Sequence, residues 1–106
     1  MITQEFLQQC SDEQINKGVE WMLCKELSLC DHSPFDDYQF GYFNTLNYCT
    51  SPNDIMPIAF ANMFSICPIF RNSDTYRVGS RCGIYVFNAN PLRAICEVYI
   101  LMSVNK

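Results

Sequence analysis

The residues best suited to acid–base chemistry are His32, the single histidine, and Asp31 next to it. A carboxylate beside an imidazole can orient the ring as a general base, which must then lie within hydrogen-bond reach of a nucleophile. No such nucleophile is identifiable beside this pair in the sequence. The four glycines also form neither a G-x-G-x-x-G motif nor a Walker loop. We therefore predict that the protein is not an enzyme and has no catalytic residues.

The seven cysteines are the next candidates, either as metal ligands or as a disulfide framework. Their number is odd and no C-x-x-C pair occurs, whereas zinc sites draw on closely spaced ligand pairs. Disulfide frameworks are typical of secreted chains with a signal peptide, and the first residues have neither a basic region nor a long apolar stretch. We therefore expect a cytoplasmic protein, without metal or cofactor, whose reduced cysteines serve as small core residues.

Three arginines could gather around the phosphate of an anionic ligand: Arg77, Arg81 and Arg93. Arg93 stands just inside the N-terminus of a predicted helix, where the helix dipole disfavours positive charge. Its side chain has three alternative partners. It can pair with Glu97 one turn later, or reach back to Asp54 or Asp36. It can also bind an anionic ligand, which the free N–H groups of the helix end would attract too.

Six aromatic residues lie within the fourteen residues from 35 to 48. Tyr38, Phe40 and Tyr42 alternate as one face of a strand would, although Gly41 weakens a regular strand. Two interpretations stay open. The stretch is either an irregular segment whose aromatic rings point into the core, or a contact surface, since aromatic residues are enriched at recognition sites.

The sequence predicts helices at both ends of the chain, and these must position the candidate residues. Residues 2–9 form a short helical lead-in, and Ser11 with Gln14 forms a capping box that begins a helix of about four turns. Apolar residues recur in this helix at helical spacing: Ile15, Val19, Met22, Leu23 and Leu27. Trp21 lies off this stripe, and is either at the edge of the core or an exposed anchor.

The middle of the chain predicts a helix from 52 to about 63, with Ser51 as its cap and Asp54 in its first turn. Pro57 should kink or interrupt it. Residues 66–70 read as a strand, in which Pro68 implies an edge position or a bulge. Residues 76–78 and 84–87 read as two further strands, joined by the glycine-bracketed hairpin loop 79–83.

The last helix, residues 90–102, begins with Asn90 as a cap and Pro91 at its first position. It is apolar on almost every side, which predicts a buried helix, and its one polar stripe, Arg93 and Glu97, should face water or a partner. We therefore predict an α+β fold with a single small domain, 1–106. It has an N-terminal amphipathic helix, a short central helix, and a small antiparallel sheet of about three strands packed against a largely buried C-terminal helix.

The composition limits the classes of partner that the protein is expected to bind. A net charge of −4 and a pI of about 4.7 disfavour direct binding to nucleic acid, which needs clustered Lys and Arg. An apolar fraction of 49% with 17% charged residues is typical of an ordered globular protein. The apolar part of the last helix is shorter than the roughly 20 residues of a membrane span. We expect no membrane association, and the oligomeric state, a dimer included, stays open.

Two segments resemble the NinX-like family, small proteins of tailed phages and prophages without an assigned activity. The first segment matches a family motif, Asn-Pro-Ser-Asp-Ala-Trp-Pro-Ile, at four positions: Pro52, Asp54, Pro57 and Ile58. The second, Asn90 to Ala94, matches Asn-Pro-Leu-Arg-Ala in full. Met56 replaces the motif's Trp, and the aromatic stretch has no counterpart in the family. The resemblance implies a phage or prophage origin and the cytoplasm of a bacterial host.

Two functional hypotheses follow. In the first, the chain is a phage or prophage accessory protein that acts by binding, as a stoichiometric inhibitor or modulator of a host protein, for instance one used in defence. In the second, it sequesters a small anionic ligand such as a nucleotide, held by arginines and stacked on aromatic rings. The candidate partner- or ligand-binding residues are Tyr38, Phe40, Tyr42, Asp54, Arg77 and Arg93.

Overall fold

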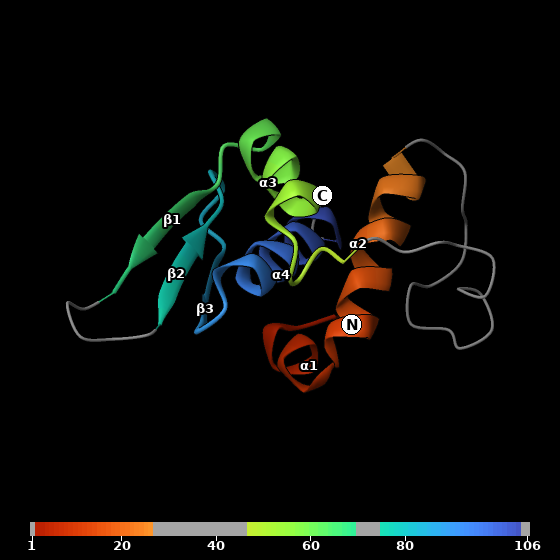
Figure 1. Cartoon of the computed structure of the whole chain (residues 1–106), viewed down its shortest axis with the longest axis horizontal. Coiled ribbons are helices and arrows are strands. Elements are labelled where there is room, and N and C mark those ends of the chain that lie inside the picture. The colour runs from red at the N-terminus through yellow and green to blue at the C-terminus, as the bar shows by residue number, and fades with distance from the viewer. Residues whose placement is uncertain (1, 27–46, 70–74, 105–106) are drawn as a thin grey trace.

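The last helix, α4, lies in the middle of the molecule and contacts most of the other elements (Figure 1). The fold is that of a computed structural model, which describes residues 2–26, 47–69 and 75–104. Within these ranges the elements are α1 (Gln4–Gln9), α2 (Asp12–Glu26), α3 (Pro52–Ala61), β1 (Ser65–Pro68), β2 (Tyr76–Gly79), β3 (Tyr85–Asn88) and α4 (Pro91–Val104). The sheet lies on one side of α4, and α1 and α2 lie on the other. The predicted α+β fold is confirmed.

Helix α4 begins where the sequence predicts, because the Asn90 side chain caps it. Asn90 Oδ1 accepts hydrogen bonds from the backbone N–H groups of Leu92 at 3.0 Å and of Arg93 at 3.4 Å. Every residue from 94 to 101 is buried. Because α4 is apolar on almost every side, other elements cover it on almost every side, as predicted.

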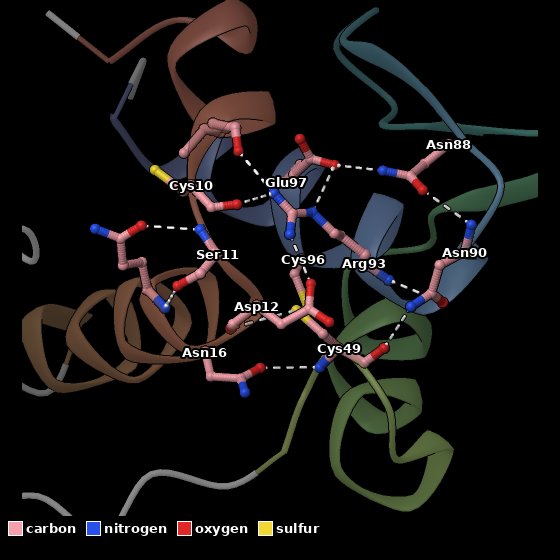
Figure 2. A network of polar contacts seen from close by, with 12 residues as sticks. Cys10, Ser11, Asp12, Asn16, Cys49, Asn88, Asn90, Arg93, Cys96 and Glu97 are labelled. Atoms are coloured by element: carbon pink, nitrogen blue, oxygen red, sulfur yellow. Dashed lines mark hydrogen bonds and ion pairs between the residues drawn. The ribbon is translucent and has the colours of Figure 1, made fainter.

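The expectation for the polar stripe of α4 is wrong. The Glu97 side chain has no exposed surface and that of Arg93 is 13% exposed, so the stripe does not face water. It lies instead in the junction between α4 and the turn that joins α1 to α2 (Figure 2).

Helix α2 begins with the predicted capping box. Gln14 N–H donates to Ser11 Oγ at 3.2 Å, and Ser11 N–H donates to Gln14 Oε1 at 2.8 Å. Three residues of the predicted apolar stripe are buried: Ile15, Val19 and Met22. Trp21 is 9% exposed and belongs to the same core cluster, which decides between its two interpretations.

Helix α3 has the predicted N-cap position, but the Ser51 side chain makes no capping hydrogen bond. The helix continues through Pro57 to Ala61 without interruption. The chain then leaves it in a left-handed turn at Met63, whose φ is 56°, and Phe64 N–H donates back to Ala59 O at 3.0 Å. This bond pattern closes the C-terminus of α3 and directs the chain into β1.

The antiparallel sheet has the strand order β1-β2-β3. Val78 pairs with Val86, and both are fully buried on the face that α4 covers. Pro68 lies in β1, an edge strand, as predicted for proline. The β2–β3 hairpin closes through Ser80 N–H, which donates to Ile84 O at 2.9 Å, and Gly83 adopts a φ of 91° that suits glycine.

The described part of the predicted aromatic stretch consists of residues 47 and 48. Tyr48 is 3% exposed and its hydroxyl donates to Glu20 on α2, so this ring points into the core. Tyr38, Phe40 and Tyr42 lie outside the described residues. In the ranges that the structure does describe, α1 to α4 are each too short or too polar to cross a lipid bilayer.

Candidate functional site

Arg93 is the centre of a polar network that joins α4 to the N-terminal helices (Figure 2). Its Nη1 donates to Asp12 Oδ1 at 2.6 Å, and its Nη2 donates to the backbone oxygens of Leu7 at 2.8 Å and Cys10 at 2.6 Å. Its Nε lies 3.8 Å from Glu97 Oε2. Burial alone would lower the pKa of Arg93, but the hydrogen bond to Asp12 and the charge of Glu97 raise it overall. The guanidinium is thus engaged on all sides within the fold.

These contacts explain why an arginine stands at a helix N-terminus. Leu7 lies in the last turn of α1 and Cys10 is its C-cap, so both oxygens belong to the negative end of that short helix. Leu7 O already accepts from Cys10 N–H at 3.1 Å, so the guanidinium gives it a second donor and also gives Cys10 O a donor. A cation is favourable at this negative end of the helix. Arg93 is therefore unfavourable for its own helix and favourable for α1.

Glu97 is a carboxylate buried inside this network. Its Oε2 accepts from Asn88 Nδ2 at 3.2 Å, whereas its Oε1 has no hydrogen-bond partner among the described residues. Burial raises the pKa of Glu97, and the charge of Arg93 and the hydrogen bond from Asn88 offset that rise only in part. The pair with Arg93 is the expected i, i+4 contact, but it lies in the interior rather than on the surface.

The same network anchors the segment before α3. Cys49 N–H donates to Asn16 Oδ1 at 2.9 Å, and Cys49 O accepts from Asn90 Nδ2 at 2.8 Å. Asn90 thus caps α4 and also ties it to a distant part of the chain. The Asn90–Ala94 motif is accounted for by these packing roles, without a ligand.

Three cysteines are buried around the network, and two more lie nearer the surface: Cys10, Cys49 and Cys96 in the first group, and Cys67 and Cys82 in the second. The five are free, with 3.9 Å between Cys49 Sγ and Cys96 Sγ. Burial raises the pKa values of the Cys10 and Cys96 thiols. The prediction that the cysteines serve as small core residues therefore holds for the first group, and is wrong for the exposed Cys82.

A different group of side chains covers the face of the sheet opposite α4. Side chains alternate along a strand, so buried Val78 and Val86 imply that Arg77, Tyr85 and Phe87 point the other way. Tyr85 is 47% and Phe87 51% exposed. The Arg77 guanidinium carbon lies 5.2 Å from the centre of the Tyr85 ring, within cation–π range. We call Cys67, Arg77, Tyr85 and Phe87 the outer sheet face.

Gly79 allows the Tyr85 ring to lie flat on this face. A Cβ built on Gly79 would come within 2.5 Å of Tyr85 Cε1, so the glycine leaves the space that the ring fills. A hollow of about 200 Å³ lies on the same face, with these lining residues: Cys67, Pro68, Ile69, Arg77 and Phe87. Large aromatic rings beside an arginine and a hollow are typical of the centre of a protein-binding site.

The structure separates the predicted site residues. Arg77 lies on the outer sheet face, whereas Arg93 lies in the helix junction with Asp12 and Glu97 as its carboxylate partners. Asp54 is not the partner of Arg93; its Oδ2 accepts from Asn47 N–H at 3.1 Å, before α3. Asp36, the other alternative, lies outside the described residues.

Sequence reasoning missed Tyr85 and Phe87 as site residues. In the sequence, Tyr85 and Phe87 alternate with Val86 in one predicted strand, and Arg77 lies in the strand before it. This alternation was the signal that could have placed the three residues on one face of the sheet. Alternation alone does not say which face of a sheet a helix will cover, so the signal was incomplete.

The described residues contain no group of three or more His, Cys, Asp or Glu side chains that could hold a metal ion. Comparisons with models of protein families, with curated proteins and with solved structures found no match to this chain.

Proposed function

We propose that this chain is an accessory protein of a tailed phage or prophage that binds a host protein in the bacterial cytoplasm and inhibits or modulates it. The observation that carries the binding part is the outer sheet face, where Tyr85 and Phe87 are about half exposed beside Arg77. Aromatic residues and arginine dominate binding energies in protein interfaces. The phage origin rests on the likeness of Asn90–Ala94 and residues 51–58 to the NinX-like family, which has no assigned activity. The role against a host defence protein is proposed from that origin.

We propose binding rather than catalysis because the polar groups of the junction between α4 and the N-terminal helices serve the fold. Arg93, Glu97 and Asn90 are engaged with one another and with backbone groups, and the pKa of Glu97 is explained by burial within that network.

Affinity purification from a bacterial host that expresses the tagged chain tests the proposal. We expect a host protein to co-purify in a stoichiometric complex with the unchanged chain and to be lost with the double variant Tyr85→Ala/Phe87→Ala. Phe60→Ala is the matched control, because Phe60 is 72% exposed on α3 and is not part of the outer sheet face. Equal recovery with all three chains, or no stoichiometric partner at all, would refute the proposal. Tyr38→Ala/Tyr42→Ala in the same purification tests the predicted contact at residues 38–42.

The hollow beside Arg77 favours one alternative, a small anionic ligand such as a nucleotide. Its volume of about 200 Å³ and its arginine suit part of such a molecule, with the base stacked on Phe87. Arg93 has no role in this version, because its guanidinium is engaged elsewhere. A ligand at 100 times its dissociation constant would stabilise the chain by about 2.7 kcal/mol. A thermal-shift screen of nucleotides, with Arg77→Ala as control, should then show a shift that the variant loses.

A further inference from the structure

Both edges of the sheet carry a feature that hinders pairing with a further strand, whereas the outer sheet face is exposed. Pro68 lies in the edge strand β1 and has no N–H to donate, which blocks pairing with a further strand. At the other edge, the Gln4 side chain of α1 donates to Tyr85 O at 3.0 Å. A partner is therefore expected to dock on the side chains of the face rather than to extend the sheet.

The volume of the hollow suits one side chain of a partner rather than a whole cofactor. Binding pockets for drug-sized molecules usually measure about 300–1,000 Å³, whereas a cavity of about 150 Å³ holds a benzene molecule. The hollow beside Arg77 measures about 200 Å³. A single large apolar side chain, such as that of Phe or Leu, matches this volume.

The charge of the sheet region indicates which residues of a partner would surround that side chain. Residues 63–90 carry three arginines and one aspartate, although the whole chain has a net charge of −4. In the described part of this segment the charged residues are Arg77 and Arg81, without a carboxylate. Arg77 is stacked on the Tyr85 ring and makes no salt bridge among the described residues. A guanidinium held in this way is suited to a carboxylate of a partner.

We infer that the outer sheet face binds an acidic protein segment that inserts one large apolar side chain into the hollow and places a neighbouring carboxylate on Arg77. The inference rests on the proposed function and names the chemistry of the partner segment. Phe87, which lines the hollow, flanks the inserted side chain, and the Tyr85 ring covers one side of Arg77. Both rings thus exclude water from the Arg77–carboxylate pair, which strengthens it.

Synthetic peptides test the inference directly on the full chain. The probes are three fluorescein-labelled peptides of about twelve residues: one with a central Phe flanked by Asp and Glu, one with Ala in place of that Phe, and one with Lys in place of the acidic residues. Fluorescence anisotropy measures their affinity. We expect the acidic Phe peptide to bind and each of the other two to bind at least about tenfold more weakly, since both the anchor and the charge contribute.

Two pairs of variants locate the binding. Arg77→Glu should weaken binding of the acidic Phe peptide at least about tenfold, whereas Arg81→Glu, with the same change of net charge outside the hollow, should weaken it no more than about threefold. Phe87→Ala should likewise weaken binding about tenfold, and Phe60→Ala should leave it unchanged. An equal effect of both arginine variants would show a general charge attraction and overturn the assignment of the hollow.

Other results identify other occupants. Displacement of the peptide by a nucleoside monophosphate would overturn the inference in favour of a small ligand. Self-association in light scattering that Arg77→Glu abolishes would identify a second copy of the chain as the occupant, and would overturn it too. If a host protein co-purifies through Tyr85 and Phe87 but the acidic Phe peptide does not bind, the inference fails while the proposed function stands. If no host protein co-purifies, the proposed function fails whatever the peptides do.

Discussion

Arg93 shows how one side chain can stabilise an element to which it does not belong. Its guanidinium joins the C-terminus of α1, the first residue of α2 and a buried carboxylate of α4. Its planar fork can meet several acceptors in fixed directions, which an ammonium group cannot do. Loss of this side chain would leave Glu97 buried without its cation, and would remove one donor each from Leu7 O and Cys10 O.

We therefore expect Arg93→Ala to lower the free energy of unfolding by about 3 kcal/mol, because it removes one partner of a mostly buried ion pair. Arg93→Lys should recover only part of the loss. Urea denaturation followed by circular dichroism measures both. Arg81→Ala, which removes an exposed arginine, serves as the control and should change stability by less than about 0.5 kcal/mol. A change that small for Arg93→Ala would contradict the network's structural role.

Glu97 gives the fold a pH dependence of known sign. Its pKa is raised in the folded chain above that of an unfolded glutamate, about 4.3, because burial disfavours the charged form. The folded state therefore binds the proton more tightly, and the stability that this group contributes is fully present at low pH. It is lost as the pH rises through the raised pKa.

Glu97→Gln isolates this effect, because it removes the titrating group and leaves the other carboxylates, Asp12 included, in place. We expect the unchanged chain to lose stability relative to the glutamine variant as the pH is raised from about 4 to about 7. Parallel urea titrations at several pH values give the difference. A difference that is flat, or that changes in the opposite direction, would show that the pKa of Glu97 is not raised in the fold.

At the scale of elements, the junction between α3 and β1 combines a favourable hydrogen-bond pattern with an unfavourable residue. Met63 occupies the left-handed position after the helix, with a φ of 56°, where glycine is usual. Its side chain is 65% exposed, and its sulfur accepts from Arg81 Nη1 at 3.2 Å. Little packing therefore offsets the backbone strain.

Met63→Gly should accordingly stabilise the chain by about 0.5–1 kcal/mol, since it relieves a strained backbone conformation. Met63→Ala is the matched control. It also removes the sulfur contact with Arg81 but keeps a Cβ, so we expect no gain in stability from it. Thermal unfolding measures both variants, and an equal effect of the two substitutions would show that the φ value is not the cause.

At the scale of the whole molecule, α4 carries two different surroundings. The sheet covers it on one side, and α1 and α2 cover it on the other, where the polar network lies (Figures 1 and 2). The buried apolar residues form one core cluster that includes members of all these elements. The network lies on the helical side, and on the other side Tyr85 and Phe87 of the outer sheet face are about half exposed within the described part of the chain.

Cysteine reactivity should report on this arrangement. Under native conditions a thiol reagent should modify Cys82 and Cys67 within minutes, whereas Cys10, Cys49 and Cys96 should react only on unfolding. Mass spectrometry of digested, labelled protein assigns each site, and denatured protein gives the reference for full labelling. Rapid native labelling of Cys49 or Cys96 would contradict the close packing between α4 and the segment before α3.

Much of the fold could be predicted because it depends on local chemistry. The capping box at Ser11, the cap at Asn90 and the proline in β1 each act over a few residues, and each is found where the sequence predicts it. The apolar surface of the last helix likewise predicts its burial without knowledge of its neighbours. The predicted contact at the aromatic residues 38–42 stays a prediction, because these residues lie outside the described ranges.

The sequence by itself determined which segments are helices and strands, and that the last helix must be buried, because periodicity and caps are properties of neighbouring residues. Only the tertiary structure decided where the polar side chains point. Arg93 meets Leu7 and Cys10 across more than eighty positions of the chain, and no local pattern encodes such a contact. The tertiary structure also decided which face of the sheet α4 covers, and so left Arg77, Tyr85 and Phe87 exposed together.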